Sequence, residues 1–165
     1  MKDQYLVTIR LIERLHRRFL DVIKTELDRL GIEDINNVQT LILSNINEDQ
    51  LTVAYLSMMS HINDQLTVGE LTIRGYYLGS NVSYNVKKLV ENGYLIQERS
   101  SHDRRMTRVR LSDKGLELTA KIDQLYERNA EAVAEGIVSQ EQLTELNNVL
   151  NGLERYWSRL VNFTR

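Results

Sequence analysis

Polar and basic side chains gather in one stretch, residues 79–115, with a spacing suited to binding rather than to catalysis. A short helix is expected at its start, because apolar residues recur at i, i+4, i+7 and i+8: Val82, Val86, Leu89 and Val90. The opposite face carries amide, hydroxyl and ammonium groups, from Asn81, Tyr84, Lys87 and Lys88. Such groups bind phosphates and base edges of duplex DNA, so this helix predicts nucleic-acid recognition.

A basic hairpin is predicted directly after this helix. Gly93 ends the helix, and residues 94–100 then read as a strand. Residues 101–105 read as a polar turn with two arginines, and residues 107–111 alternate polar and apolar, as a half-buried strand does. A helix followed by such a hairpin is typical of a winged helix. The helix enters the major groove, and the arginine tip reaches the adjacent minor groove.

Charge along the chain supports this interpretation, although the net charge is only −2. Residues 74–112 contain 8 Lys and Arg against 3 Asp and Glu, whereas residues 1–73 contain 7 against 11 and residues 113–165 contain 6 against 9. A basic segment within an acidic remainder is the electrostatic footprint of phosphate binding.

Several kinds of chemistry find no support in the sequence. Without cysteine there are no disulfides, cysteine zinc sites or thiol redox centres. The three histidines, His16, His61 and His102, are isolated, so no metal site or cofactor is expected, and no catalytic motif appears. No apolar run approaches the roughly 20 residues that a membrane helix needs, so no membrane partner is expected. We expect a cytoplasmic protein that is not an enzyme.

Long helices are predicted on both sides of the basic segment, since the chain contains no proline. Apolar stripes predict a first helix over 3–30, a second over 36–47 that begins with an Asn36–Gln39 capping pair, and later helices over 113–135 and about 140–162. Ser112 or Asp113 is expected to cap the third of these, and an S-x-x-Q box from Ser139 opens the last. The stripes exceed what one small core can cover, which predicts a dimer interface built from the two ends of the chain.

One segment repeats within the chain. Residues 46–53, INEDQLTV, return almost unchanged as residues 62–68, INDQLTV. We expect the second copy to lead into a helix at about 67–73, because Thr67 and Glu70 form a capping box there. The first copy is expected to form an inserted helix over 52–61, within an insertion at about 50–63. This insertion either reshapes a ligand pocket with Tyr55, Met58 and Met59 or is tolerated at the surface.

The motifs of this chain resemble those of the MarR (multiple antibiotic resistance regulator) family of bacterial transcription factors. The matching runs are LTVGEL (66–71), SNVS (80–83), LVENGYL (89–95), and DRR (103–105) followed by VRLSDKG (109–115). The resemblance implies a mainly α fold with a small β-hairpin wing, a winged helix-turn-helix whose N- and C-terminal helices form a dimerisation region. The expected domains are residues 1–35 and 113–165 for dimerisation and 36–112 for DNA binding. It also implies a homodimer that binds a pseudo-palindromic operator in double-stranded DNA, acts as a repressor, and releases the operator when a small aromatic effector binds.

The candidate DNA-binding residues come from the turn, the recognition helix and the wing. They are Arg74, Ser80, Asn81, Ser83, Tyr84, Lys87, Lys88, Asp103, Arg104, Arg105 and Arg108. Asp103 is expected to orient an arginine through a charge-assisted hydrogen bond. By resemblance, Arg105 is the residue expected in the minor groove, while Arg104 contacts a phosphate or pairs with Asp103.

The candidate effector-binding residues are His16, Phe19, Tyr76 and Tyr77, from the first helix and the turn before the recognition helix. Each has a plain alternative, because a histidine beside an apolar stripe and tyrosine rings in a turn also serve as packing groups. The inserted helix keeps a second function open. If it misplaces the helix at 67–73, the chain is instead a ligand- or partner-binding module with a degenerate helix-turn-helix.

Overall fold

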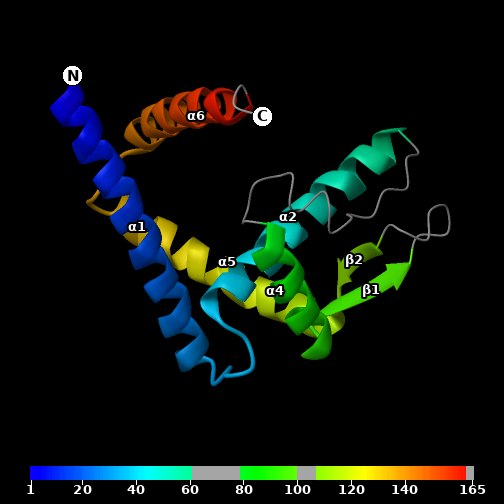
Figure 1. The fold of residues 1–165 in the computed structure, drawn as a ribbon. Helices are drawn as coiled ribbons and strands as arrows, with labels where there is room; N and C mark the ends of the chain where they lie inside the picture. Colours follow the sequence, from blue (N-terminus) through cyan, green and yellow to red (C-terminus); the bar gives the residue numbers. More distant parts are fainter. Residues whose placement is uncertain (61–78, 100–106, 163–165) are drawn as a thin grey trace. The chain divides into compact units, whose positions relative to one another are not determined.

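The computed structural model describes residues 1–60, 79–99 and 107–162, and the side chains of 1–48, 82–98 and 109–161 among them. In chain order the elements are α1 (Lys2–Arg29), α2 (Asn37–Ser60), α4 (Gly79–Glu91), β1 (Leu95–Arg99), β2 (Thr107–Leu111), α5 (Asp113–Ala134) and α6 (Gln140–Asn162) (Figure 1). The expected fold class is confirmed: helices dominate, and β1 and β2 form an antiparallel hairpin. The chain divides within α5 into two compact units, Met1–Asp123 and Gln124–Arg165.

Helix ends are determined by the residues that the sequence indicated. Gly31 and Gly93 have φ of 66° and 79°, a left-handed conformation that glycine adopts without strain, and each follows a helix. Asn36 and Gln39 cap α2 reciprocally: each side-chain oxygen accepts the other residue's backbone N–H, at 3.1 Å and 2.8 Å. Ser139 and Gln142 form the same box at the start of α6.

Buried apolar side chains of the first unit come from every element in it. They are Ile23 and Leu27 of α1, Leu43 and Ile46 of α2, Val82, Val86 and Leu89 of α4, Leu95, Val109 and Leu111 of the hairpin, and Leu118 and Ile122 of α5. α2 contacts α1, α4 and β2, so it lies at the centre of this core. The hairpin is in the register Leu95 opposite Leu111, which turns Leu95, Val109 and Leu111 into the core.

The second helix differs from expectation. The apolar pattern predicts an end at residue 47 and a separate inserted helix from Thr52, whereas α2 continues unbroken to Ser60. No glycine or proline interrupts residues 37–60, and residues 48–51, between the two expected helices, are compatible with helix. The helix expected at 67–73, the turn at 74–79 and the hairpin tip at 101–105 lie outside the described residues, apart from Gly79, which begins α4.

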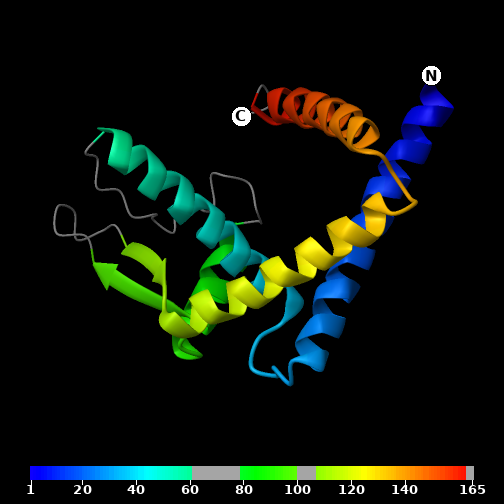
Figure 2. The ribbon, with the colours of Figure 1, turned by 180° about the vertical axis from the view of Figure 1, so that it is seen from behind.

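The junction between β2 and α5 packs against residues 92–94, which follow α4 (Figure 2, seen from behind). Ser112 caps α5, because its Oγ accepts the Gly115 N–H at 3.0 Å, and the same hydroxyl donates to the Gly93 carbonyl at 2.6 Å. The Ser112 N–H also donates to the Tyr94 carbonyl, at 3.0 Å. In the described part of the chain, no helix is long and apolar enough to cross a membrane.

Candidate nucleic-acid interface

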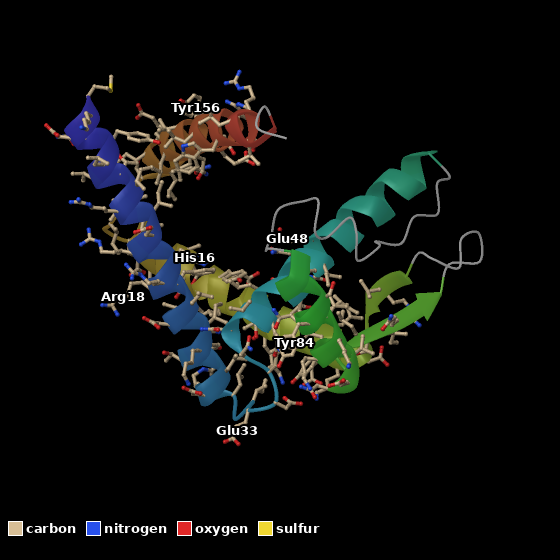
Figure 3. All side chains as sticks on the ribbon, viewed as in Figure 1. His16, Arg18, Glu33, Glu48, Tyr84 and Tyr156 are labelled. Carbon is tan, nitrogen blue, oxygen red and sulfur yellow. The ribbon has the colours of Figure 1, made fainter. Side chains whose placement is uncertain are left out.

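α4 is held by one face and exposes the other. Val82, Val86 and Leu89 are at most 3% exposed, so the inner face is fixed in the core. Ser83 and Lys87 are exposed on the outer face, and Tyr84 is 61% exposed and points away from the helix axis (Figure 3). A hydroxyl, a phenol and an ammonium group therefore lie on the same open surface, as the helical spacing predicted for Tyr84 and Lys87.

The two lysines of α4 differ in how far a neighbouring carboxylate neutralises them. Lys88 Nζ lies 2.7 Å from Glu91 Oε2, whereas Lys87 Nζ lies 3.8 Å from Glu91 Oε1. The hydrogen bond with Glu91 raises the pKa of Lys88 above its usual value, and the same bond lowers the pKa of Glu91. The Lys87 side chain is 76% exposed against 41% for Lys88, so Lys87 is the more available of the two for an incoming phosphate.

α4 thus brings together four of the candidate DNA-binding residues, Ser83, Tyr84, Lys87 and Lys88. Ser80 and Asn81 lie in the first turn of α4, and Arg108 lies in β2, but their side chains fall outside the described set. Arg74, Asp103, Arg104 and Arg105 fall outside the described residues altogether. At the base of the hairpin, Arg110 Nε donates to Glu98 Oε1 at 3.1 Å across the strands.

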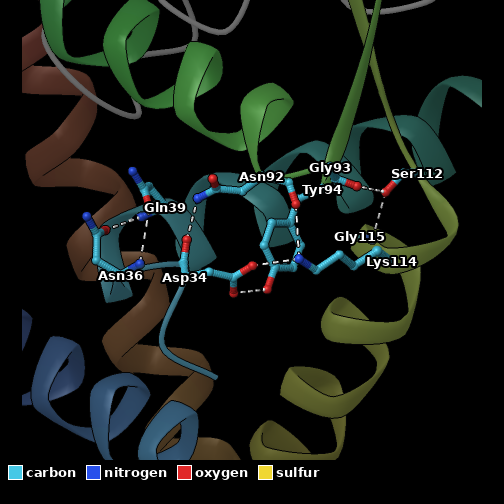
Figure 4. A network of polar contacts seen from close by, with 9 residues as sticks. All are labelled: Asp34, Asn36, Gln39, Asn92, Gly93, Tyr94, Ser112, Lys114 and Gly115. Carbon is cyan, nitrogen blue, oxygen red and sulfur yellow. Dashed lines mark hydrogen bonds and ion pairs between the residues drawn. The ribbon is translucent and has the colours of Figure 1, made fainter. Parts of the chain in front are cut away.

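A polar cluster at the C-terminal end of α4 escaped the sequence analysis (Figure 4). Asp34, in the connector between α1 and α2, accepts hydrogen bonds from the Tyr94 hydroxyl at 2.7 Å and from Lys114 Nζ at 2.6 Å. The Asn92 side-chain amide donates to the Asp34 backbone carbonyl. Lys114 Nζ also donates to the Asn92 carbonyl at 3.0 Å and lies 4.0 Å from the centre of the Tyr94 ring, a cation–π distance.

The pKa values of Asp34 and Tyr94 in this cluster shift in opposite directions. Partial burial works against ionisation of Asp34, but the hydrogen bonds from Lys114 and Tyr94 outweigh it and lower the pKa of Asp34 below its ordinary 3.8. Burial, and then the adjacent Asp34 carboxylate, raise the pKa of the Tyr94 phenol far above its ordinary 10.0. At neutral pH the cluster therefore holds an ionised Asp34 and a protonated Tyr94.

A second polar contact reaches the inner face of α4. Gln39 Nε2 of α2 donates to Asn85 Oδ1 at 3.2 Å, and these residues are 6% and 8% exposed. The capping role of Gln39 was expected from its spacing, but its contact with a residue 46 positions away was not. In the described residues, no cluster of three or more His, Asp or Glu could hold a metal ion.

The expected effector residues are only partly described. His16 and Phe19 are exposed on α1, while Tyr76 and Tyr77 lie outside the described residues. A cavity of about 780 Å³ opens on α1 and the start of α2. It is lined by other residues: Leu11, Arg14, Leu15, Arg17, Arg18, Leu20, Asp21 and Asn37.

Comparison with known proteins places these features in context. Residues 35–115 match a family described as a winged helix DNA-binding domain. Over 159 residues, the chain is 33% identical to a protein of Rhizobium meliloti (strain 1021) named the exopolysaccharide II synthesis transcriptional activator ExpG, covering 96% of this chain and 74% of that protein.

Solved structures share the fold at low sequence identity. FabT of Streptococcus pneumoniae, solved in complex with DNA, has a TM-score of 0.70 and 17% identity, and the match covers 94% of this chain and 99% of that one. MarR of Staphylococcus aureus, solved in complex with salicylate and kanamycin, has a TM-score of 0.71 and 22% identity, with 94% and 93% covered.

Proposed function

The chain belongs to the MarR family of winged helix DNA-binding transcription regulators and is not an enzyme, and from this we propose that it acts as a homodimer on a pseudo-palindromic operator. Each protomer would place α4 in the major groove of one half-site. The two recognition helices would then lie about 34 Å apart, one turn of duplex.

One observation carries the proposal: the inner face of α4 is buried while its outer face presents Ser83, Tyr84 and Lys87. This supports a working recognition helix, because α4 is fixed in the core by one face and open to a ligand on the other. The helix expected at 67–73, on which the degenerate alternative depends, lies outside the described residues. Contacts to DNA from the residues outside the described side chains remain part of the proposal. These are Arg74, Ser80, Asn81, Asp103, Arg104, Arg105 and Arg108.

Exposed apolar side chains support the homodimer. On α1, the side chains of Val7, Leu11 and Leu15 are 55%, 42% and 58% exposed. On α6, those of Leu146, Val149 and Leu160 are 48%, 56% and 51% exposed. Stripes of this size on separate helices mark interaction surfaces. We propose residues 1–35 and 113–165 as the dimerisation region, with a second copy of the chain as the partner.

The direction of regulation has two candidates. The sequence analysis expected a repressor, but the relative at 33% identity is named a transcriptional activator. The chain's own contacts do not separate these roles, because the outcome depends on where the operator lies relative to the promoter. A reporter gene behind the operator, measured with and without the protein, distinguishes the two directly.

A small aromatic acid is the proposed effector. The Staphylococcus aureus MarR structure, whose fold this chain shares, was solved with salicylate. In this chain, the cavity on α1 combines leucines with Arg14, Arg17 and Arg18, groups that suit an apolar ring bearing a carboxylate. Operator release by such a compound would support effector control, and a screen of aromatic acids that neither stabilises the protein nor releases DNA would leave a constitutive binder.

The test of the main proposal is binding to the DNA upstream of the protein's own gene. Fluorescence anisotropy at several salt concentrations should give an affinity that exceeds that for a random duplex and falls steeply with salt. Footprinting should then show two protected half-sites about one helical turn apart. A complex that is neither sequence-dependent nor salt-sensitive would instead favour the partner-binding module.

A further inference from the structure

We propose that residues 34–39, which are the end of the connector between α1 and α2 and the first turn of α2, position the recognition helix α4 through two polar anchors and thereby set how well α4 fits an operator. The inference rests on the proposed function. It assigns roles to Asp34 and Gln39 that involve no contact with DNA.

The first anchor holds the C-terminal end of α4. Asp34 accepts hydrogen bonds from the Tyr94 hydroxyl and from Lys114 of α5, and its backbone carbonyl accepts one from Asn92 (Figure 4). Asn92 and Tyr94 lie on either side of the glycine that ends the helix. A single connector residue therefore fixes both sides of that helix end, together with the first turn of α5.

The second anchor holds the middle of α4. Gln39 uses its carbonyl oxygen to cap α2 and its amide nitrogen to hold Asn85. Because Gln39 and Asn85 are buried, neither reaches DNA, and loss of this bond would deprive two buried amides of a hydrogen bond. The two anchors are 7 residues apart on the Asn85–Asn92 stretch, about two helical turns, which is enough to define the tilt of α4.

Residues 32–39 are in turn fixed to α1. Asn37 Nδ2 donates to the Leu20 carbonyl at 3.1 Å, and the Ile32 N–H donates to the Leu27 carbonyl at 3.0 Å. Hydrogen bonds thus run from the backbone of α1 through residues 32–39 to α4. A contiguous network of this kind carries a displacement of α1 to the recognition helix. Asn37 also lines the cavity on α1, so a ligand there would act on the same path.

Asp34→Asn is the first variant to examine, because it preserves shape and removes the charge that holds Lys114. Tyr94→Phe removes only the hydroxyl of the same anchor, and Gln39→Glu preserves the capping oxygen of the second anchor while removing the amide donor. Glu33→Gln is the matched control: it removes an equal charge one residue away, at a side chain that makes no hydrogen bond or ion pair within the described part of the chain.

The measurement compares operator and random-duplex affinity for each folded dimer, together with amide hydrogen exchange over residues 86–94 without DNA. Asp34→Asn should weaken operator binding about tenfold, a change of about 1.4 kcal/mol. Affinity for the random duplex and the slope of log affinity against log salt should remain unchanged. Amide hydrogen exchange of residues 86–94 should accelerate. If Asp34 had only a structural role, Asp34→Asn would lower the melting temperature without changing the ratio of operator to random-duplex affinity.

Three results overturn the proposal: equal operator affinity for Asp34→Asn and wild type, the same loss in Glu33→Gln, or unaltered exchange over residues 86–94 in Asp34→Asn. If wild-type protein binds no duplex in a sequence-dependent way, the proposed function itself fails.

Discussion

Gly115 lies so close to the carbonyl oxygen of Tyr94 that a Cβ atom at position 115 would collide with it. The same carbonyl accepts the Ser112 N–H, so it cannot simply turn aside. Residues 111–115, the LSDKG part of the matching run VRLSDKG, therefore form a packing junction between hairpin and helix. In this run Ser112 caps α5, Lys114 binds Asp34 and Gly115 provides space.

Gly115→Ala should consequently destabilise the protein. The obstacle is backbone, which does not rotate away as a side chain does, so we expect a loss of about 1–3 kcal/mol in urea unfolding. Gly136→Ala is the control, because a Cβ at 136 meets nothing within 4 Å and Gly136 has no positive φ. Equal stability of the two variants would contradict the proposed collision.

The sequence was informative where neighbours along the chain determine structure. The capping pairs at Asn36 and Ser139, the glycine stops and the inner face of α4 all follow from local spacing, and they are confirmed. Asp34 was not identified, because its partners Tyr94 and Lys114 lie 60 and 80 residues away and an exposed connector aspartate has no distinguishing local pattern. The length of α2 was misjudged because the repeat of residues 46–53 suggested a separate inserted helix from Thr52, although no glycine or proline breaks residues 37–60.

Acid should weaken the Asp34 anchor. The folded-state pKa of Asp34 is below its ordinary 3.8, so its contribution to stability is present above that pH and is lost as pH falls through the folded-state value. The stability difference between wild type and Asp34→Asn should therefore stay constant from pH 8 to about 5 and shrink below about pH 4. Urea unfolding across this range measures it. A difference that persists undiminished at the lowest pH would mean that the carboxylate charge is not what stabilises the junction.

Lys87 and Lys88 should contribute unequally to DNA binding. Lys87→Ala should reduce the slope of log affinity against log salt by about one, as expected for one lost phosphate contact. Lys88→Ala should change it less, because Glu91 already neutralises Lys88 at 2.7 Å. Glu91→Gln should strengthen binding and remove this inequality by freeing Lys88. Equal slopes for the two alanine variants in the wild-type background would show that the ion pair opens on DNA.

A charge placed in the apolar stripes should separate the dimer. Leu15 of α1 and Val149 of α6 are 58% and 56% exposed, so Leu15→Glu and Val149→Glu should leave each protomer folded while placing a carboxylate where a second copy is proposed to pack. Ile137→Glu is the matched control, because Ile137 is 75% exposed but lies in the turn between α5 and α6. Light scattering should report monomers for the first two variants and a dimer for the third.

Operator affinity should fall when dimerisation is lost, because a monomer engages one half-site only. Dimers for all three variants would place the interface elsewhere on the molecule.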